Sequence, residues 1–494
     1  MRAYVWTNSM KCTVIVILGL MIALFPGCAS MAEGQVGSLE PKEVSPLIEG
    51  EEAMDLSGYW QGSLAINPTN SLGIGFTMIS TGEGHYEAML QIPTQGVRNF
   101  AVSSVRQEET LITIEIEQLQ ASFSGTYDFA AQQIVGTFTQ MGQSLPLVLT
   151  LGEPIENTRP QDPSKPYPYI SEDIAFTQTP EDFLLAGTIT RPEGNGPFPA
   201  VVLVSGSGSQ NRDEALMGHR PFLVLSDALT RSGIVVLRYD DRGFGESGGD
   251  ARNATSLDLA DDAQSAVDHL KTLPYVDADS IGIIGHSEGA IIGAIVAQRE
   301  KDLAFLVLMA GSGVNGLAVL EDQTAAILRA KQAPEAVIAQ TVETNMAVYT
   351  TILDESRTLE ERKESVLQTM VSLGFPPDAA KSQISTLFSP WYMTFLTLDP
   401  ANYLQGLDIP VMILNGTKDT QVSATLHVPS IEAALLSGGN KRYTTKVYEG
   451  LNHLFQPAIT GAPDEYASIE MTIDPRVLQD ISSWIIDIKQ NQGV

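Results

Sequence analysis

One serine of this chain lies in a turn framed by glycines that is suited to nucleophilic chemistry. The sequence GHSEG at 285–289 follows an apolar, strand-like run (281–284) and precedes a helix-like run of small residues (290–298). A nucleophile elbow of the G-x-S-x-G type requires this strand–turn–helix setting, because only glycines fit beside so sharp a turn. We predict that Ser287 is a nucleophile at a helix N-terminus, where developing negative charge is favoured.

A second match to the same pattern lies upstream, at residues 245–249. It follows a strand-like run (234–239), but only after a polar loop, and Gly249, Asp250 and Asn253 extend the loop where a helix would have to begin. We therefore expect Ser247 to be an ordinary loop serine, which leaves Ser287 as the candidate.

Two downstream residues complete the arrangement that such a serine needs. A base must take the hydroxyl proton and a carboxylate must hold that base, in the chain order serine, acid, histidine. His453 follows the strand-like run 443–448, and Asp419, which is also a typical Asx-turn residue, follows the run 410–416. Both lie at carboxyl ends of strands, where open α/β sheets carry their sites. His427, in a helix or loop, is expected on the surface.

Two backbone N–H groups must stabilise the oxyanion that forms when the serine attacks. One is expected from Glu288, directly after the nucleophile, and the other from the glycine-rich loop 205–209, which follows the strand-like run 200–204. We assign the second donor to Ser207, with Gly208 as the alternative. The loop lacks both the Lys-Ser/Thr ending of a P-loop and the full dinucleotide fingerprint, which argues against a phosphate-binding turn.

These motifs together resemble the α/β-hydrolase family over about 171–488. The shared features are the elbow at Ser287, RYDDRGFGES at 238–247, NGTKD at 415–419 and LNH at 451–453. The chain looks most like bacterial acyl-ester hydrolases near the dienelactone-hydrolase and prolyl-oligopeptidase-like branches, in which an N-terminal β domain often precedes the catalytic one. Its oxyanion loop begins Ser-Gly, where many esterases have His-Gly.

The residues and the resemblance predict a serine carboxylic-ester hydrolase that acts on small to medium acyl esters through an acyl-enzyme. A serine peptidase or amidase with the same triad is the main alternative, with Arg212 and Arg242 as candidates to bind a peptide's terminal charge. A non-catalytic ligand-binding lipoprotein, with the N-terminal domain as its active part, is the alternative from another class.

The elements that position these residues alternate between strand and helix from residue 171 to 494. Eight strand-like runs predict a mostly parallel sheet whose first two strands are antiparallel; they are 174–178, 184–190, 200–204, 234–239, 281–284, 303–309, 411–414 and 444–448. Upstream, residues 55–152 alternate with a period of two between turns, which predicts a small antiparallel barrel or sandwich. Five prolines make residues 153–170 a stiff linker.

A helical cap is expected at about 312–402, because the stretch between two core strands is too long for one crossover. Such lids exclude water and shape a pocket. Trp391 and Phe395 close this segment, and they either line the pocket or simply pack a core. The Glu288 side chain either faces the pocket, where it would prefer a cationic or hydroxylated substrate, or only complements the helix dipole.

The N-terminus carries the features of a signal peptide over 1–27, with Arg2 and Lys11 before an apolar run. The sequence LFPGC at 24–28 resembles a bacterial lipoprotein signal, which implies that Cys28 is lipidated and becomes N-terminal. Residues 28–54 are then an acidic tether. We expect the protein to be anchored in the cell envelope, facing the periplasm or at the outer membrane if the cell has two membranes.

The composition limits the partners of the chain. A formal charge of −30 over 494 residues disfavours nucleic acid and anionic head groups. Of the two cysteines, Cys12 would leave with the signal and Cys28 would be acylated, so we expect no disulfide. The histidines show no metal-type spacing, and we predict no metal and no cofactor. A small ester is the expected partner, and the sequence does not indicate an oligomeric state.

Overall fold

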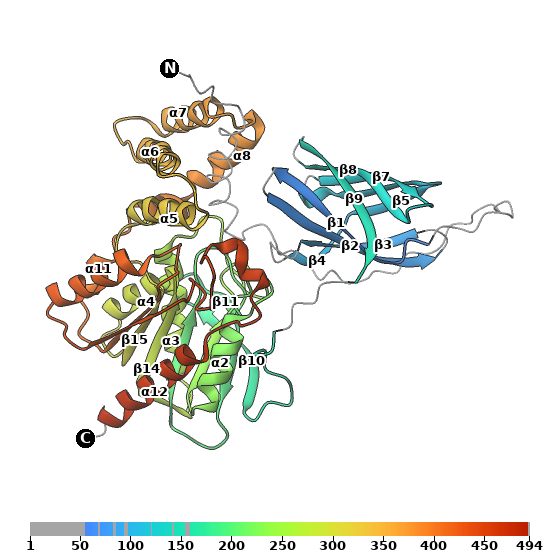
Figure 1. The fold of residues 1–494 in the computed structure, drawn as a ribbon. Coiled ribbons are helices and arrows are strands. Elements are labelled where there is room, and N and C mark those ends of the chain that lie inside the picture. The colour runs from blue at the N-terminus through green and yellow to red at the C-terminus, as the bar shows by residue number, and fades with distance from the viewer. Residues whose placement is uncertain are drawn as a thin grey trace.

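The computed structural model describes residues 55–492 except 68–69, 83–84, 93–96, 120, 141–142 and 154–158. The chain forms a nine-stranded sheet and, after the linker, an eight-stranded sheet with helices (Figure 1). The predicted signal segment, the lipidation site Cys28 and the tether lie outside the described residues.

The first sheet is a closed antiparallel barrel. Its order is β2-β1-β9-β8-β7-β6-β5-β3-β4, and β2 also pairs with β3, which closes the sheet on itself. Alternate side chains point inward, as in β6, and Trp60, Phe76 and Phe123 fill the interior. Its elements are β1 (Gly58–Asn67), β2 (Asn70–Gly82), β3 (His85–Ile92), β4 (Val97–Ala101), β5 (Ser104–Glu108), β6 (Leu111–Ile116), η2 (Glu117–Leu119), β7 (Ala121–Asp128), β8 (Gln133–Gln140) and β9 (Gln143–Gly152).

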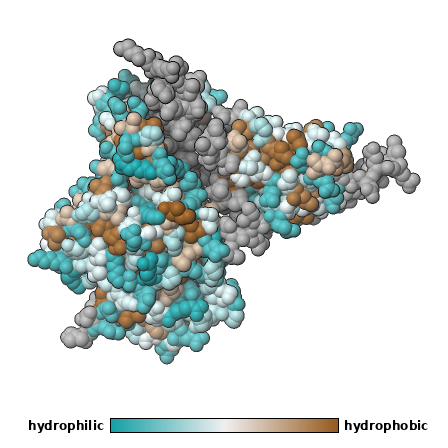
Figure 2. All heavy atoms as spheres, viewed as in Figure 1, coloured by the Kyte–Doolittle hydropathy of each residue, from teal (hydrophilic) through white to brown (hydrophobic). Residues whose placement is uncertain are grey.

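The barrel also exposes apolar side chains on its outside. Val135 and Val148 lie directly opposite each other on β8 and β9, and both are exposed. Phe129, in the turn before β8, is 65% exposed. In the space-filling view, hydrophobic residues are interspersed with hydrophilic ones over the visible face of the barrel (Figure 2).

The second sheet has the strand order β10-β11-β13-β12-β14-β15-β16-β17. The pairs β10–β11 and β11–β13 are antiparallel, and every later pair is parallel. This is the α/β-hydrolase fold, and it confirms the predicted fold class. The strands are β10 (Ile170–Gln178), β11 (Phe183–Arg191), β12 (Phe198–Val204), β13 (Val235–Tyr239), β14 (Val276–His286), β15 (Phe305–Met309), β16 (Val411–Gly416) and β17 (Tyr443–Tyr448).

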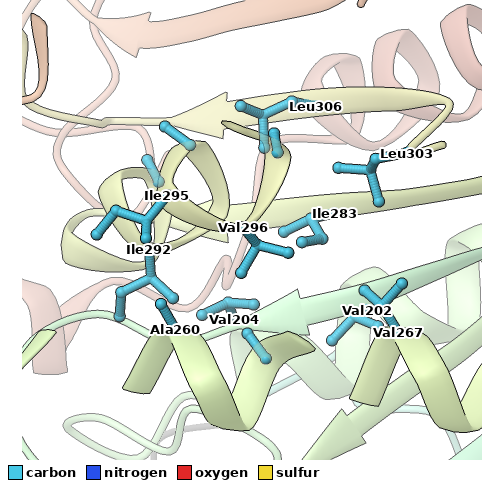
Figure 3. Close-up of a cluster of buried hydrophobic side chains, with 14 of the residues drawn as sticks. Val202, Val204, Ala260, Val267, Ile283, Ile292, Ile295, Val296, Leu303 and Leu306 are labelled. Atoms are coloured by element: carbon cyan, nitrogen blue, oxygen red, sulfur yellow. The ribbon is translucent and has the colours of Figure 1, made fainter. Parts of the chain in front are cut away.

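Helices cover both faces of this sheet, and its central strands are accordingly almost continuously apolar, as in β13, β15 and β16. One face packs against α2 (Pro221–Arg231) and α12 (Pro475–Gln492). The other face packs against α3 (Ser256–Lys271), α4 (Glu288–Arg299) and α11 (Ala424–Ser437). Figure 3 shows part of the second core, formed by Val202, Val204, Ala260, Val267, Ile283, Ile292, Ile295, Val296, Leu303 and Leu306.

Five helices between β15 and β16 form the cap. They are α5 (Gly316–Ala330), α6 (Glu335–Ile352), α7 (Leu359–Ser372), α8 (Pro377–Leu387) and α9 (Pro390–Thr397), and the short α10 (Ala401–Leu404) leads back to the sheet. They bury an apolar core of their own. In Figure 1, α6, α7 and α8 lie on the side of α5 that is farther from the sheet. A short 3-10 helix, η3 (Pro463–Ser468), precedes α12. None of the described helices combines the length and apolarity needed to cross a bilayer.

Candidate active site

Ser287 occupies a strained turn between β14 and α4. Its backbone lies at φ 55° and ψ −117°, a region that non-glycine residues occupy only when the surrounding structure forces it. A Cβ at Gly285 would lie 2.1 Å from the carbonyl oxygen of Gly289, and one at Gly289 would lie 2.1 Å from that of Val204. Both framing glycines are therefore required by close backbone approach, as the motif predicts.

His453 and Asp419 form a buried hydrogen-bonded pair. The His453 Nδ1 atom lies 2.8 Å from Asp419 Oδ2. The other carboxylate oxygen, Oδ1, accepts the backbone N–H groups of Gln421 and Val422, each at 2.8 Å. Asp419 thus makes the turn contacts of its loop with one oxygen and fixes the imidazole with the other. The arrangement leaves Nε2 as the ring nitrogen available for proton transfer.

One partly open cavity, of about 90 Å³, brings most of the predicted residues together. Ser287, His453, Ser207, Glu288 and Phe395 all line it, with Asp419 behind His453. Cap helix α5 contributes further lining residues, Val319, Leu320 and Gln323. Ser287 therefore faces a small chamber between the sheet and the cap.

Trp391 lies beside this chamber and is not one of the lining residues that the described part of the chain provides. Its ring stacks on Phe395, with centroids 5.3 Å apart and planes 11° from parallel. Its Nε1–H donates to Glu288 Oε1 at 2.9 Å. The sequence left pocket lining and core packing open for both aromatics, and the structure places only Phe395 on the cavity.

The predicted oxyanion loop is fixed by two buried carboxylates. Asp241 accepts the Ser205 hydroxyl at 3.1 Å and the Gln210 N–H at 2.7 Å, while Glu214 accepts the Gly206 N–H at 2.9 Å. Burial raises the pKa of Asp241 well above its usual value, although these hydrogen bonds oppose the rise. Glu288 opens α4, and the first N–H groups of a helix have no intrahelical acceptor.

His286 and Glu214 form a buried ion pair beside Ser287 that was not predicted from the sequence. His286 Nδ1 lies 2.8 Å from Glu214 Oε1, and Nε2 lies 3.0 Å from the carbonyl oxygen of His453. Because both ring nitrogens face oxygen acceptors, the imidazole is held as a double donor. Burial lowers the pKa of His286, but the charge and hydrogen bond of Glu214, the His453 carbonyl and the charge of Asp419 together raise it above the usual value.

This ion pair joins three parts of the site. Glu214 holds the predicted oxyanion loop through Gly206, His286 precedes Ser287, and the carbonyl that His286 binds belongs to His453. The position of His286 in the elbow motif was visible in the sequence. Its partner was not, because Glu214 lies 72 residues away and meets it only in the folded chain.

The Glu288 side chain is buried at 3% exposure and does not point into solvent. Its Oε1 accepts the hydroxyl of Ser256 at 2.6 Å as well as the Trp391 N–H. Burial raises the pKa of Glu288, although Ser256, Ser207 and Trp391 act to lower it. The Ser207 hydroxyl is close enough to contribute to that effect, yet no described residue makes a well-formed hydrogen bond to Oε2.

Other predictions fare differently. His427 is fully buried, and its Nδ1 accepts the Gly313 N–H at 3.1 Å, so the expectation of a surface histidine is wrong.

Ser247 is the loop serine expected, since its hydroxyl donates to the Asp240 carbonyl at 2.7 Å. The two arginines considered for a peptide terminus, Arg212 and Arg242, are already engaged with carboxylates of the chain.

Within the described residues, no group of three or more His, Cys, Asp and Glu side chains is arranged to hold a metal ion. The chemistry that the cavity can perform is carried by the hydroxyl of Ser287, the imidazole of His453 and backbone N–H groups.

Known proteins resemble parts of this chain. A sequence model of the family described as serine aminopeptidase, S33, matches residues 220–364. Esterase EstD of Thermotoga maritima is 30% identical over 308 residues, which cover 61% of this chain and 65% of the relative. The chain thus spans just under two thirds of that relative's length. The matched family segment contains Ser287 and ends before Asp419.

Solved structures resemble the chain at lower identity. The esterase Pf2001 of Pyrococcus furiosus is 16% identical, with a TM-score of 0.41, covering 68% of this chain and 97% of that one. The hypothetical protein PA2218 of Pseudomonas aeruginosa is 17% identical, with a TM-score of 0.42, covering 68% of this chain and 99% of that one.

Proposed function

We propose that this protein is a serine hydrolase that cleaves small to medium carboxylic esters through an acyl-enzyme. The observation that carries the proposal is the strained Ser287 facing the same cavity as His453, whose Nδ1 is held 2.8 Å from Asp419. The similarity to esterase EstD supports the same class of reaction.

The reaction follows from the roles of these groups. His453 takes the proton of the Ser287 hydroxyl as its oxygen attacks the ester carbonyl. Asp419 orients the ring and stabilises the imidazolium. The N–H groups of Glu288 and Ser207 hold the oxyanion, and His453 then protonates the leaving alcohol. Water, activated by the same histidine, attacks the acyl-enzyme and releases the carboxylic acid.

The cavity and the Glu288 carboxyl bear on substrate choice. A chamber of about 90 Å³ is smaller than the roughly 300 Å³ at which typical ligand pockets begin, which favours short acyl groups unless the cap moves. Glu288 lines this chamber, and the buried Oε2 of its carboxyl lacks a well-formed partner among the described residues. We infer a preference for substrates that carry a hydroxyl or cationic group near the carbonyl.

A peptidase or amidase is the second candidate, because the family that matches residues 220–364 is described as a serine aminopeptidase. The engagement of Arg212 and Arg242 in internal ion pairs removes the groups first considered for binding a peptide terminus. The ester hydrolase therefore remains the preferred function.

Hydrolysis of matched substrates separates the candidates. We expect p-nitrophenyl acetate and butyrate to be cleaved, and alanine p-nitroanilide to be cleaved far more slowly. Ser287→Ala should lower kcat by about 10⁶-fold. Ser247→Ala, the control in the second G-x-S-x-G sequence, should change kcat less than about tenfold. Faster cleavage of the anilide would favour the peptidase, and no hydrolysis by the folded protein would overturn both.

The cell-envelope location is a further part of the proposal, motivated by LFPGC at 24–28. We infer that Cys28 is lipidated and anchors the mature chain. Intact-mass measurement of protein purified from bacterial membranes should show an acylated N-terminus at Cys28, and Cys28→Ser should release the protein from the membrane fraction. An unmodified Cys28 within an uncleaved N-terminus would contradict this.

A further inference from the structure

A second cavity, which we call the cationic cleft, shares the loop 205–220 with the active-site chamber. Its volume is about 740 Å³, which falls within the range of roughly 300–1,000 Å³ that organic ligands occupy. Linker, sheet and loop all contribute to its walls, through Lys165, Pro166, Tyr167, Tyr169, Ser171, Asp173, Thr188, Arg212, Asp213, Arg220, Leu223 and Arg238.

The walls of the cleft are cationic, although the chain is strongly acidic. Four of the lining side chains are lysine or arginine and two are aspartate, whereas the whole chain has a formal charge of −30. A concave surface with an excess of one sign of charge attracts ligands of the opposite sign. The cleft thus has an electrostatic character unlike that of the protein around it.

Arg238 lies in the wall of the cleft and is incompletely paired. It is 5% exposed, and its Nη1 donates to Asp213 Oδ1. Its Nε is buried and has no partner in the part of the chain that the structure describes. Burial, and then the nearby charge of Arg212, lower its pKa to about 10. A buried guanidinium is normally paired through several of its five N–H groups, so Arg238 is incompletely paired. Its Nε has almost no accessible surface and Nη1 is bound to Asp213, which leaves Nη2 as the group that can meet a ligand.

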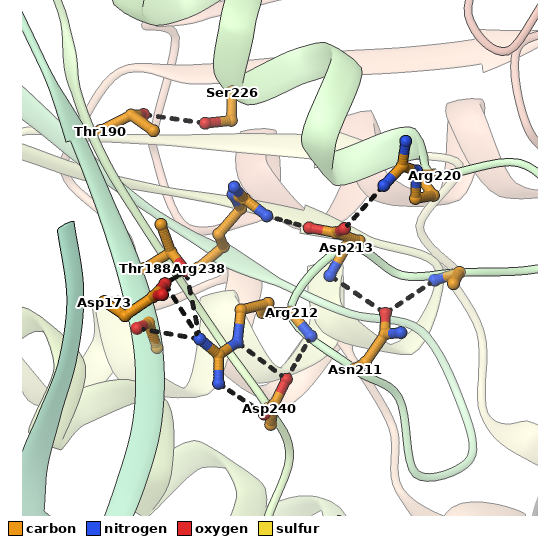
Figure 4. A network of polar contacts seen from close by, with 12 residues as sticks. Asp173, Thr188, Thr190, Asn211, Arg212, Asp213, Arg220, Ser226, Arg238 and Asp240 are labelled. Carbon is orange, nitrogen blue, oxygen red and sulfur yellow. Dashed lines mark hydrogen bonds and ion pairs between the residues drawn. The ribbon is translucent and has the colours of Figure 1, made fainter. Parts of the chain in front are cut away.

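Arg212 lies in the same network, and its side chain is fully engaged. Its Nε and Nη2 donate to the two oxygens of Asp240 at 3.1 and 2.7 Å, and Nη1 donates to the Gly187 carbonyl and to Thr188. Figure 4 shows the two guanidinium groups near each other, with Arg238 directed toward Asp213 and Arg212 toward Asp240. Of these two arginines, only Arg238 is therefore incompletely paired.

Two further cations lie at the opening of the cleft. Arg220 uses Nε and Nη2 for Asp162, while its Nη1 is 4.0 Å from Asp213, too far for a hydrogen bond. Lys165 makes no ion pair with any carboxylate among the described residues, and its Nζ lies 5.9 Å from the centre of the Tyr167 ring. Both side chains have N–H groups available for an incoming anion.

Aromatic faces complete the cleft. Tyr167 and Tyr169 stack with ring centroids 5.1 Å apart and planes 10° from parallel, and the Tyr169 hydroxyl is fixed by Asp227 at 2.8 Å. Together with Pro166 and Leu223 they offer an apolar surface beside the cationic groups. This combination suits a ligand with a charged end and a ring or short chain.

We propose that the cationic cleft binds a small organic anion. Its carboxylate or phosphate group would pair with Arg238, Lys165 and Arg220, and its ring would pack on Tyr167 and Tyr169. A guanidinium pairs with such a group through charge-assisted hydrogen bonds. The loop between the cavities turns Asp213 toward the cleft and Glu214 toward the active site, so ligand in the cleft contacts the loop that holds Gly206.

Calorimetric titration of the full chain carrying Ser287→Ala tests this without any substrate turnover. The probes are phenyl phosphate, benzoate and inorganic phosphate at constant ionic strength. We expect saturable binding of at least one aromatic anion, weaker binding of inorganic phosphate, and affinity that falls as salt is added. Phenyl phosphate and benzoate distinguish a phosphate from a carboxylate ligand. Inorganic phosphate binding as tightly as both would overturn the role given to the tyrosines.

Variants locate the site. Lys165→Gln combined with Arg220→Gln should weaken binding at least about tenfold, and so should Arg238→Lys, which keeps the charge and removes the planar guanidinium. Arg252→Gln, at a side chain that is 88% exposed and outside the cleft, is the charge-matched control and should bind as before. No saturable binding by the folded protein, or equal binding by all four proteins, would overturn the proposal.

Discussion

The two cavities that share the loop 205–220 differ in how their charged groups are held. Beside Ser287, Asp419 is bound by an imidazole and two backbone N–H groups, and Glu214 is bound by His286 and Gly206. In the cationic cleft, Arg238 has Asp213 as its one ion-pair partner among the described residues. Contacts from several elements hold the carboxylates beside Ser287 in fixed positions, as a catalytic site requires. The incomplete pairing of Arg238 instead leaves it able to bind a ligand.

Of the substitutions outside Ser287, Asp419→Asn should have the largest effect on catalysis. An asparagine keeps the shape of the side chain but stabilises the wrong tautomer of His453, and the expected loss in kcat is about 10⁴-fold. Stopped assays with p-nitrophenyl butyrate would measure it, with thermal unfolding as the control for folding. A loss of less than tenfold in a normally folded variant would show that Asp419 does not hold the base.

His286→Gln tests the ion pair that links the parts of the site. Removing the imidazolium leaves Glu214 buried without its cation, which should cost about 3–5 kcal/mol of stability near pH 6. The folded pKa of His286 is raised. The stability that protonated His286 adds to the folded protein is therefore complete below the ordinary pKa of about 6.5. It is lost as the pH rises through the folded pKa.

Thermal unfolding of wild type and His286→Gln from pH 5.5 to 9 measures this dependence. The difference in stability should be largest at the acidic end and should narrow as the pH rises. A difference that stays constant across the range would mean that His286 contributes only through packing.

The two buried arginines, Arg242 and Arg238, sharpen the comparison within one segment of the chain. Arg242 binds Asp262 through both carboxylate oxygens at 2.7 Å and also reaches Glu181. Arg242→Gln should cost about 3–5 kcal/mol because Asp262 is left buried and unpaired. Arg238→Gln should cost only about 1 kcal/mol. Urea unfolding of the two variants gives both values, and equal costs would contradict the contrast.

Glu288→Gln should have the smallest effect on stability. The folded pKa of Glu288 is raised, first of all by burial, so the ionised carboxylate lowers stability once the pH rises through that value. Below the ordinary value of 4.5, the carboxyl is neutral and the penalty is absent. A neutral glutamine should therefore raise Tm by about 2 °C at pH 8 and leave it unchanged near pH 4.5. A lower Tm at pH 8 would contradict this.

The sequence predicted the parts of the molecule that depend on local pattern. The glycines around Ser287 are required by backbone contacts within a few residues and a neighbouring strand. Asp419 follows a strand with a plain apolar run, and His453 follows the more polar strand 443–448. The alternating strands of residues 55–152 likewise predicted a small antiparallel barrel or sandwich, and the structure has the barrel.

Features that depend on distant contacts were not predicted. Glu214 meets His286 across 72 residues, and no spacing rule joins them. His427 was expected on the surface because a histidine in a helix does not reveal what covers it, and the backbone at Gly313 contacts it. The cationic cleft includes Lys165, Tyr167 and Tyr169 from a segment that the sequence suggested was only a spacer.

The most direct test of an activated Ser287 is labelling with a fluorophosphonate, followed by mass spectrometry of the intact protein and its peptides. We predict one adduct on wild type, on the peptide that contains Ser287, and none on Ser287→Ala. Ser247→Ala should label as wild type does. An adduct that persists in Ser287→Ala, or no adduct on folded wild type, would contradict the central claim that Ser287, His453 and Asp419 form a working catalytic site.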